Sequence, residues 1–210
     1  MARILLVRHG NTIAPEGVFA GSIDNPLSER GLEQAAKLAE RLKNEDIDSV
    51  YCSDKKRAIE TAQSIIHARK ENESYAHGCN LQIAPELQEI NHGRWEGRSK
   101  DEVIRDWPDE YEEWEQDPYL FAPEGGEPAI EVVQRVIPLM RRIIKENHGK
   151  TALIVSHKAT LRLIIAHFLG IPHRLYREHF ELDQASLSIL MFNEQQQGKL
   201  MLFNDTSHYR

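Results

Sequence analysis

The sequence predicts an α/β fold, a three-layer α/β/α sandwich with a mostly parallel sheet and a C-terminal β-hairpin. Segments with helical spacing alternate with short apolar runs that are typical of buried strands, at 3–7, 47–52, 81–84 and 151–155. This alternation favours parallel strands joined by crossover helices on both faces of the sheet. Two further apolar runs flank a polar turn, and they predict the hairpin at 185–192 and 199–203.

The helices between these runs are predicted from apolar spacing and from capping residues. Ser28 is the candidate N-cap of the first helix, and Ser53 or Asp54 is the candidate for the second. Ser99 and Glu102 have the spacing of a capping box, so a third helix begins there. Longer helices are expected over 129–147 and 159–169.

The stretch 91–128 is interpreted as a helical and irregular insertion that caps a site within a single domain, 1–210. Between positions 106 and 127 it has nine acidic residues and no lysine or arginine. Those carboxylates could border the site and repel a highly anionic ligand, or they could form a solvated helix face.

The composition excludes several classes of protein. A net charge of −7 argues against nucleic acid as the main partner, because binding to its backbone needs a basic surface. No apolar run approaches the roughly 20 residues of a membrane span, and we expect no membrane partner and no signal peptide. With only Cys52 and Cys79 in the chain, we expect no disulfide framework and a cytoplasmic location.

Two histidines follow two of the predicted strands directly. His9 comes after the run 3–7, with Arg8 before it, and His157 comes two residues after the run 151–155. Ligands of open α/β sheets bind at the carboxyl ends of the strands. Imidazole can act as a nucleophile and arginine binds phosphate, so the pattern predicts phosphoryl transfer through a phosphohistidine. The alternative for each histidine alone is a structural role.

Two more residues are candidates for the same chemistry. Arg57 lies in the first turn of the second predicted helix, at the same rim of the sheet, where a helix N-terminus also favours anions. Cleavage of a phosphate ester needs a proton on the leaving oxygen, which Glu89 or Glu86 could supply. The alternative for each of these three is a surface side chain.

Several motifs in this order resemble one known family over nearly the whole chain. They are Leu6-Val7-Arg8-His9-Gly10-Asn11-Thr12, Pro26-Leu27-Ser28-Glu29-Arg30-Gly31, Tyr51-Cys52-Ser53 with Arg57-Ala58, 87–93, Gly125-Gly126-Glu127 and Val155-Ser156-His157. The set is similar to the histidine phosphatase superfamily, also called the phosphoglycerate mutase-like family. In pattern the chain most resembles its metal-independent phosphoserine phosphatases and α-ribazole phosphatases.

The resemblance implies a phosphoric monoester hydrolase that uses no metal and no cofactor. It implies that His9 is the phosphorylated nucleophile, and that Glu89 first protonates the leaving alcohol and then activates water. The remaining implied roles are binding ones: Arg8, Arg57 and His157 hold the phosphoryl group, and backbone groups near Ala20 and Gly21 line its entrance.

The chain departs from the family pattern at two places near the site. Pro15 stands where the family often has asparagine, and Asn11 could partly substitute as a substrate-binding residue. Lys158 follows His157 where the family often has glycine, and its backbone amide could take over the glycine's contact.

The sequence leaves alternatives open for the substrate and for the oligomeric state. His92 lies in a Glu-x-x-His-Gly segment found in both resembled phosphatase groups, so it is a candidate for contacting a small phosphorylated metabolite. The acidic insertion mildly favours a substrate with an ammonium group, such as phosphoserine. An α-ribazole or broad-specificity phosphatase, a 2,3-bisphosphoglycerate-dependent phosphoglycerate mutase and a phosphate-binding sensor module are the other hypotheses. A strand 185–192 at the sheet edge could mediate a homodimer.

Overall fold

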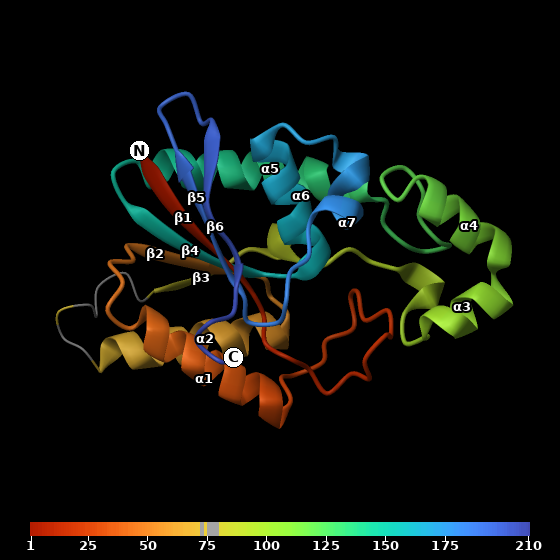
Figure 1. Ribbon diagram of the computed structural model, residues 1–210, viewed down its shortest axis with the longest axis horizontal. Helices are drawn as coiled ribbons and strands as arrows, with labels where there is room; N and C mark the ends of the chain where they lie inside the picture. The colour runs from red at the N-terminus through yellow and green to blue at the C-terminus, as the bar shows by residue number, and fades with distance from the viewer. Residues whose placement is uncertain (72–73, 75–79) are drawn as a thin grey trace.

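A twisted sheet forms the centre of the molecule (Figure 1). The computed structural model describes residues 1–71, 74 and 80–210, and within them the sheet has six strands in the order β3-β2-β4-β1-β5-β6. The first four in this order are mutually parallel, whereas β5 and β6 are antiparallel to their neighbours. The strands are β1 (Ala2–Arg8), β2 (Ser49–Cys52), β3 (Leu81–Ile83), β4 (Thr151–Ser156), β5 (Leu187–Phe192) and β6 (Gly198–Asp205).

Alternating apolar side chains of the central strands face two separate cores. Ile4 and Leu6 of β1 belong to one core, and Leu5 and Val7 belong to the other. This follows from the two-residue period of a strand, and it explains why the buried strands are apolar throughout.

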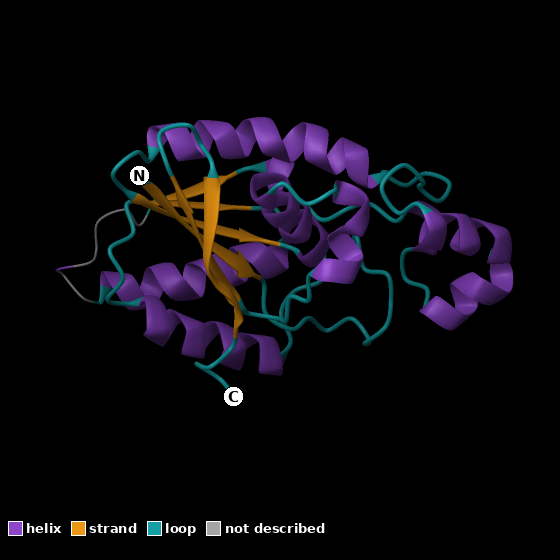
Figure 2. Cartoon of the chain, turned by 45° about the horizontal axis from the view of Figure 1, so that its top comes forward, coloured by secondary structure: helices purple, strands orange, loops and turns teal. Residues whose placement is uncertain are grey.

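Helices cover both faces of the sheet (Figure 2). On one face lie α1 (Glu29–Leu42) and α2 (Lys56–Lys70), and on the other lie α5 (Ala129–Glu146) and α6 (Lys158–Leu169), with α7 (Tyr176–His179) beside α6. The predicted three-layer α/β/α sandwich is therefore confirmed.

The observed helix caps confirm the predicted start of two helices and correct the predicted N-cap of a third. Ser28 Oγ accepts a hydrogen bond from Gly31 N at 3.1 Å and starts α1. The predicted capping box of Ser99 and Glu102 is present at the start of α3. Neither Ser53 nor Asp54 caps α2, whose N-cap is Lys55. Asp54 instead accepts hydrogen bonds from the Gln88 side chain.

Within the insertion, α3 (Lys100–Asp106) and α4 (Pro108–Gln116) lie at one end of the molecule, away from the sheet (Figure 1). They pack around Trp95, which is fully buried, together with Val103 and Trp114. Phe19 from the loop after β1 joins this cluster and ties the insertion to the N-terminal part of the chain. Trp107, Tyr111 and Phe121 pack against it as well, so the insertion's aromatic residues serve packing.

The C-terminal hairpin is confirmed, but it corrects the expectation about the sheet edge. Strand β5 lies between β1 and β6, so the edge is formed by β6. A homodimer through strand 185–192 is therefore not supported.

No helix among the described residues is long and apolar enough to cross a membrane. Cys52 is buried and free, and Cys79 lies outside the described residues.

Candidate active site

The two strand-end histidines lie side by side, as the sequence predicts. Strands β1 and β4 are parallel neighbours in register, with Arg8 opposite Ser156, so both chains leave the sheet at the same point. His9 N donates a hydrogen bond to Ser156 O at 3.1 Å, and the rings of His9 and His157 are 5.0 Å apart in an edge-on arrangement.

The environment of His9 fixes the protonation state of its ring. Its Nδ1 lies 2.7 Å from Gly10 O. Because a carbonyl only accepts, Nδ1 carries the proton and Nε2 keeps its lone pair. Burial, followed by the charges of Arg57 and Arg8, lowers the pKa of His9 well below its ordinary value. The ring is therefore neutral near pH 7, as attack on phosphorus requires.

His157 is also a neutral ring, with its proton on the other nitrogen. Arg57 Nε donates to His157 Nδ1 at 3.2 Å, so the ring proton resides on Nε2. Burial, followed by the neighbouring His9 and Arg57, lowers the pKa of His157 well below its ordinary value. His157 Nε2 is buried and has no hydrogen-bond partner among the described residues. It is thus a neutral N–H donor without an acceptor.

The two arginines are held by main-chain oxygens around the histidines. Arg8 Nη1 donates to Leu182 O at 2.6 Å, and its buried Nε has no partner in the described part of the chain. Arg57 donates to Ile23 O at 2.5 Å and to Gly21 O at 2.8 Å, so it fixes the loop after β1. Main-chain oxygens thereby orient both guanidinium groups, and neither group forms an ion pair with a carboxylate among the described residues.

Gly21 must be glycine for that loop to close over the site. Its φ is +39°, which side chains rarely adopt. A Cβ there would lie 2.1 Å from Glu96 Oε1, which already accepts hydrogen bonds from Ser22 N at 2.6 Å and His92 N at 3.1 Å. Glu96 therefore joins this loop to the segment that carries His92.

Glu89 projects from the segment after β3 toward the start of α6. Its carboxylate accepts hydrogen bonds from Ala159 N at 3.2 Å and Thr160 N at 3.3 Å, two of the free amides of the first helical turn. A helix N-terminus favours a carboxylate through these amides and through the helix dipole. The carboxylate is thus anchored at a defined place in the site.

A cavity of about 430 Å³ unites most of the predicted residues. His157 does not line it and contacts His9 from within the protein. Glu16, Glu181 and Asp183 also line it. The predicted site residues in the wall are Arg8, His9, Asn11, Ala20, Gly21, Arg57, Glu89, His92 and Lys158.

The three candidate substrate-binding side chains, Asn11, His92 and Lys158, all have other contacts within the protein. Asn11 Oδ1 accepts from Ser28 Oγ at 2.6 Å, so its oxygen is committed to the start of α1. His92 packs edge-on against Phe19, with ring centres 4.9 Å apart, and burial lowers its pKa. Lys158 forms an ion pair with Glu181. Glu181 is 23 positions away, so no local motif indicated this pair.

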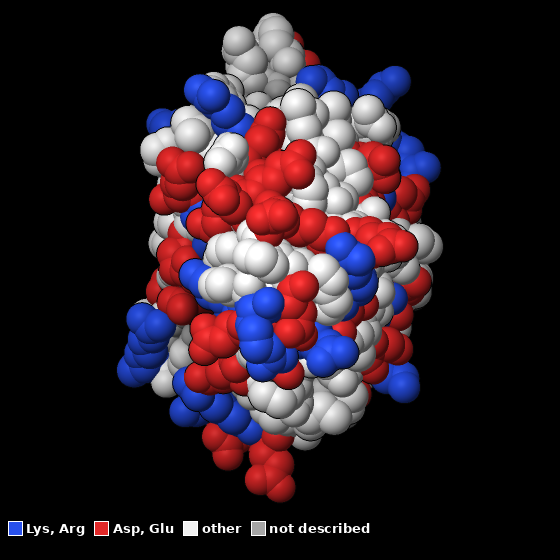
Figure 3. Space-filling model, turned by 90° about the vertical axis from the view of Figure 1, so that its right-hand side faces the viewer, with Lys and Arg blue, Asp and Glu red and all other residues white. Residues whose placement is uncertain are grey.

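The acidic residues of the insertion do not border the cavity. Figure 3 shows acidic side chains gathered on the end of the molecule where the insertion lies. Glu110 pairs with Arg94, and Glu115 pairs with Arg177 at 2.6 Å. The insertion 91–128 contributes only His92 to the described wall. The solvated-face interpretation is therefore correct, and repulsion of a ligand by the insertion is wrong.

The comparisons with known proteins agree with this geometry. Residues 4–206 match the model of the histidine phosphatase superfamily (branch 1). The chain belongs to this superfamily. It is 31% identical to phosphoserine phosphatase 1 of Hydrogenobacter thermophilus, over 99% of this chain and 94% of that protein. It is 33% identical to adenosylcobalamin/alpha-ribazole phosphatase of Escherichia coli K12, over 91% of each chain.

Solved structures of the superfamily confirm the fold. Bacillus stearothermophilus YhfR superposes with a TM-score of 0.88 at 28% identity, covering 100% of both chains. The alpha-ribazole phosphatase of Shigella flexneri gives 0.84 at 32% identity, covering 97% of this chain and 96% of its own. The predicted class of enzyme, a phosphoric monoester hydrolase of the histidine phosphatase type, is confirmed by these relatives.

Proposed function

We propose that this histidine phosphatase hydrolyses a small phosphomonoester through a phosphohistidine on His9. His9 Nε2 attacks phosphorus, the bond from phosphorus to the ester oxygen breaks, and Glu89 gives that oxygen a proton. Glu89 then takes a proton from water, whose oxygen attacks phosphorus. The phosphorus–nitrogen bond breaks, and inorganic phosphate and free His9 result.

The observation that carries this proposal is the pair of unsatisfied donors beside the nucleophile. Arg8 Nε and His157 Nε2 are buried and have no acceptor among the described residues. An unsatisfied buried donor costs about 1–3 kcal/mol, and more when it is charged. A phosphoryl group on His9 Nε2 would supply oxygens to these donors, and the charges of Arg8 and Arg57 would stabilise the transferring group.

The charges of the cavity wall support a zwitterionic substrate such as O-phosphoserine. Three cations line it, which are Arg8, Arg57 and Lys158. Four carboxylates line it as well, Glu16, Glu89, Glu181 and Asp183, so the formal sum is −1. A wall of both signs suits an alcohol part with an ammonium and a carboxylate, whereas a bisphosphate cofactor needs an excess of cations. The mutase alternative is disfavoured for this reason.

A phosphorylated nucleoside of the α-ribazole type is the second candidate. A further cavity of about 280 Å³ shares Asp183 and Gln184 with the first, and Tyr209 lines it. Such a neighbouring space could accept a larger leaving group, with an aromatic side chain available for a planar ring.

The remaining proposals concern the cellular location and the partners of the enzyme. A chain with net charge −7 and two cysteines fits a cytoplasmic enzyme whose partner is a small phosphorylated metabolite rather than nucleic acid or a membrane. Among the described residues, no group of three or more His, Cys, Asp or Glu could hold a metal ion.

The test is a substrate panel combined with trapping of the covalent intermediate. We expect the highest kcat/KM on O-phosphoserine when it is compared with α-ribazole phosphate, 3-phosphoglycerate and a sugar phosphate. Rapid acid-free quenching after reaction with a substrate radiolabelled in its phosphoryl group should leave label on the wild-type protein and none on His9→Ala. His179→Ala is the matched control, because His179 is exposed. Product binding without turnover in the wild type would favour a sensor module instead.

A further inference from the structure

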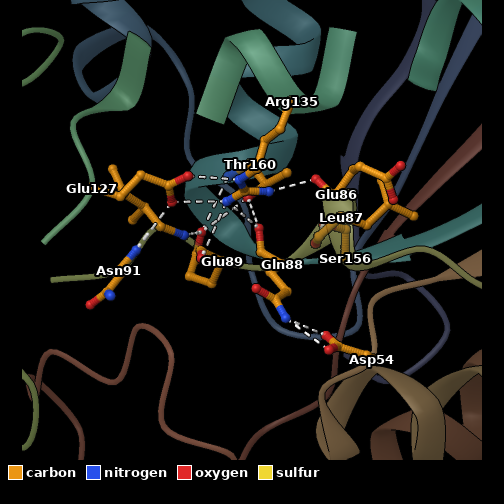
Figure 4. A network of polar contacts seen from close by, with 11 residues as sticks. Asp54, Glu86, Leu87, Gln88, Glu89, Asn91, Glu127, Arg135, Ser156 and Thr160 are labelled. Atoms are coloured by element: carbon orange, nitrogen blue, oxygen red, sulfur yellow. Dashed lines mark hydrogen bonds and ion pairs between the residues drawn. The ribbon is translucent and has the colours of Figure 1, made fainter. Parts of the chain in front are cut away.

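The segment that carries Glu89 is held in an unusual way. After the short helical turn Pro85–Leu87 it adopts neither helix nor strand up to His92, so no sheet ladder fixes its backbone. Side chains bind its carbonyl groups instead (Figure 4). Ser156 Oγ donates to Leu87 O at 2.7 Å, and Thr160 Oγ1 donates to Gln88 O at 2.6 Å.

Arg135 of α5 binds three carbonyl groups of this segment, and one of them is again Gln88 O (Figure 4). Its Nη1 donates to Glu86 O at 2.5 Å, and its Nη2 donates to Gln88 O at 3.0 Å and Glu89 O at 3.4 Å. Every carbonyl from Glu86 to Glu89 therefore accepts a hydrogen bond from a side chain. Only the planar, five-donor guanidinium can serve several acceptors in this fixed geometry.

Glu127 holds Arg135 in place. Its carboxylate accepts Arg135 Nε at 2.7 Å and Nη2 at 3.0 Å, a two-pronged ion pair. The two side chains are only 22% and 18% exposed, so water screens the pair less than a surface pair. Glu127 N donates to Asn91 O at 2.8 Å, and Asn91 N donates to the Glu127 carboxylate at 3.4 Å. The pair thus binds the segment on both sides of Glu89.

We propose that Arg135, oriented by Glu127, is a positioning residue that places the Glu89 carboxyl group for proton transfer. The inference rests on the proposed role of Glu89. The amides of α6 hold the carboxylate at its tip, and Arg135 holds the backbone from which it projects. Arg135 does not line the described cavity, so it does not contact the substrate directly. A displacement of about 1 Å can cost about 100-fold in rate.

The dependence of the rate on the leaving group tests this role. An alkyl phosphate such as O-phosphoserine needs a proton on its leaving oxygen, whereas 2,4-dinitrophenyl phosphate releases a stable phenolate without one. In Arg135→Met we expect kcat/KM, which depends on the first phosphoryl transfer and not on hydrolysis of the phosphohistidine, to fall about 10- to 100-fold on the alkyl ester and less than about 3-fold on the dinitrophenyl ester. Arg135→Lys should lie between the wild type and Arg135→Met.

Two reference variants make the outcome decisive. Glu89→Gln should show the same leaving-group pattern more strongly, and Arg142→Met, an exposed arginine on the same helix, should behave as the wild type. Equal losses of kcat/KM on both substrates in Arg135→Met would overturn the positioning role while Glu89→Gln still discriminates. If Glu89→Gln does not discriminate, the proposed acid is wrong and the inference fails with it. Should Arg135→Met not fold, Arg135→Lys and Glu127→Gln carry the same comparison.

Discussion

Acidification should destabilise this protein through its two site histidines. His9 and His157 are 8% and 0% exposed, and burial is the largest cause of the lowered pKa of each. In the unfolded chain both rings regain an ordinary pKa of about 6.5. Below that pH the unfolded state therefore binds protons that the folded state excludes, and the stability of the fold decreases as the pH falls.

The size of the effect follows from proton linkage. Each ring protonated only in the unfolded chain changes the free energy of unfolding by about 1.4 kcal/mol per pH unit. Two such rings give a slope of up to about 2.7 kcal/mol per unit below pH ~6.5, against a total stability of about 5–15 kcal/mol for a typical domain. A similar domain whose histidines are exposed would have no such slope between pH ~6.5 and ~5.

Urea unfolding at a series of pH values between about 5 and 8 measures this slope. His157→Gln removes one of the two rings, so its slope should be smaller than that of the wild type by about 1.4 kcal/mol per pH unit. His148→Gln is the control, because His148 is exposed and its loss should leave the slope unchanged. Identical slopes in the wild type and in His157→Gln would refute the assignment of His157 as a buried neutral ring.

Three shorter predictions concern the loop, the insertion and metal dependence. Gly21→Ala should lower the affinity for substrate, and it should lower the free energy of unfolding by about 1–2 kcal/mol, because the residue has a positive φ and its Cβ would collide with Glu96. A normal KM and a normal urea midpoint would contradict this. Trp95→Ala should cost about 3–5 kcal/mol in urea unfolding, because Trp95 is fully buried in the insertion's cluster; a cost below ~1 kcal/mol would mean that the insertion does not need it. Incubation with EDTA followed by dialysis should leave kcat unchanged, because Arg8, Arg57 and His157 supply the positive charge and the donors; loss of activity that Zn²⁺ or Mg²⁺ restores would overturn the metal-free mechanism.

The sequence was sufficient where structure follows from local pattern. The apolar runs before His9 and His157 predicted two buried strands, and the rule for strand ends placed both histidines at one edge. Ser99 and Glu102 identified a helix start, because a capping box involves residues only three positions apart. The predicted cap at Asp54 was wrong, because its carboxylate accepts hydrogen bonds from the distant Gln88 side chain instead of capping the helix.

Charge at the site was the property that the sequence predicted worst. The sequence left two interpretations of the acidic run in the insertion open, a repulsive border and a solvated face, and only the structure shows that Glu110 and Glu115 pair with arginines elsewhere on the chain. The carboxylates that do line the cavity, such as Glu16 and Glu181, come from segments that carry no motif.

What the sequence alone determined was therefore the type of fold and the set of candidate site residues, since both depend on short-range periodicity and on motifs of a few residues. The tertiary structure decided which ring nitrogen of His157 carries the proton, and how Arg135 holds the segment of Glu89. Arg57 contacts His157 from 100 positions away, and Arg135 contacts the main-chain oxygen of Glu89 from 46 positions away, so no local pattern encodes either contact.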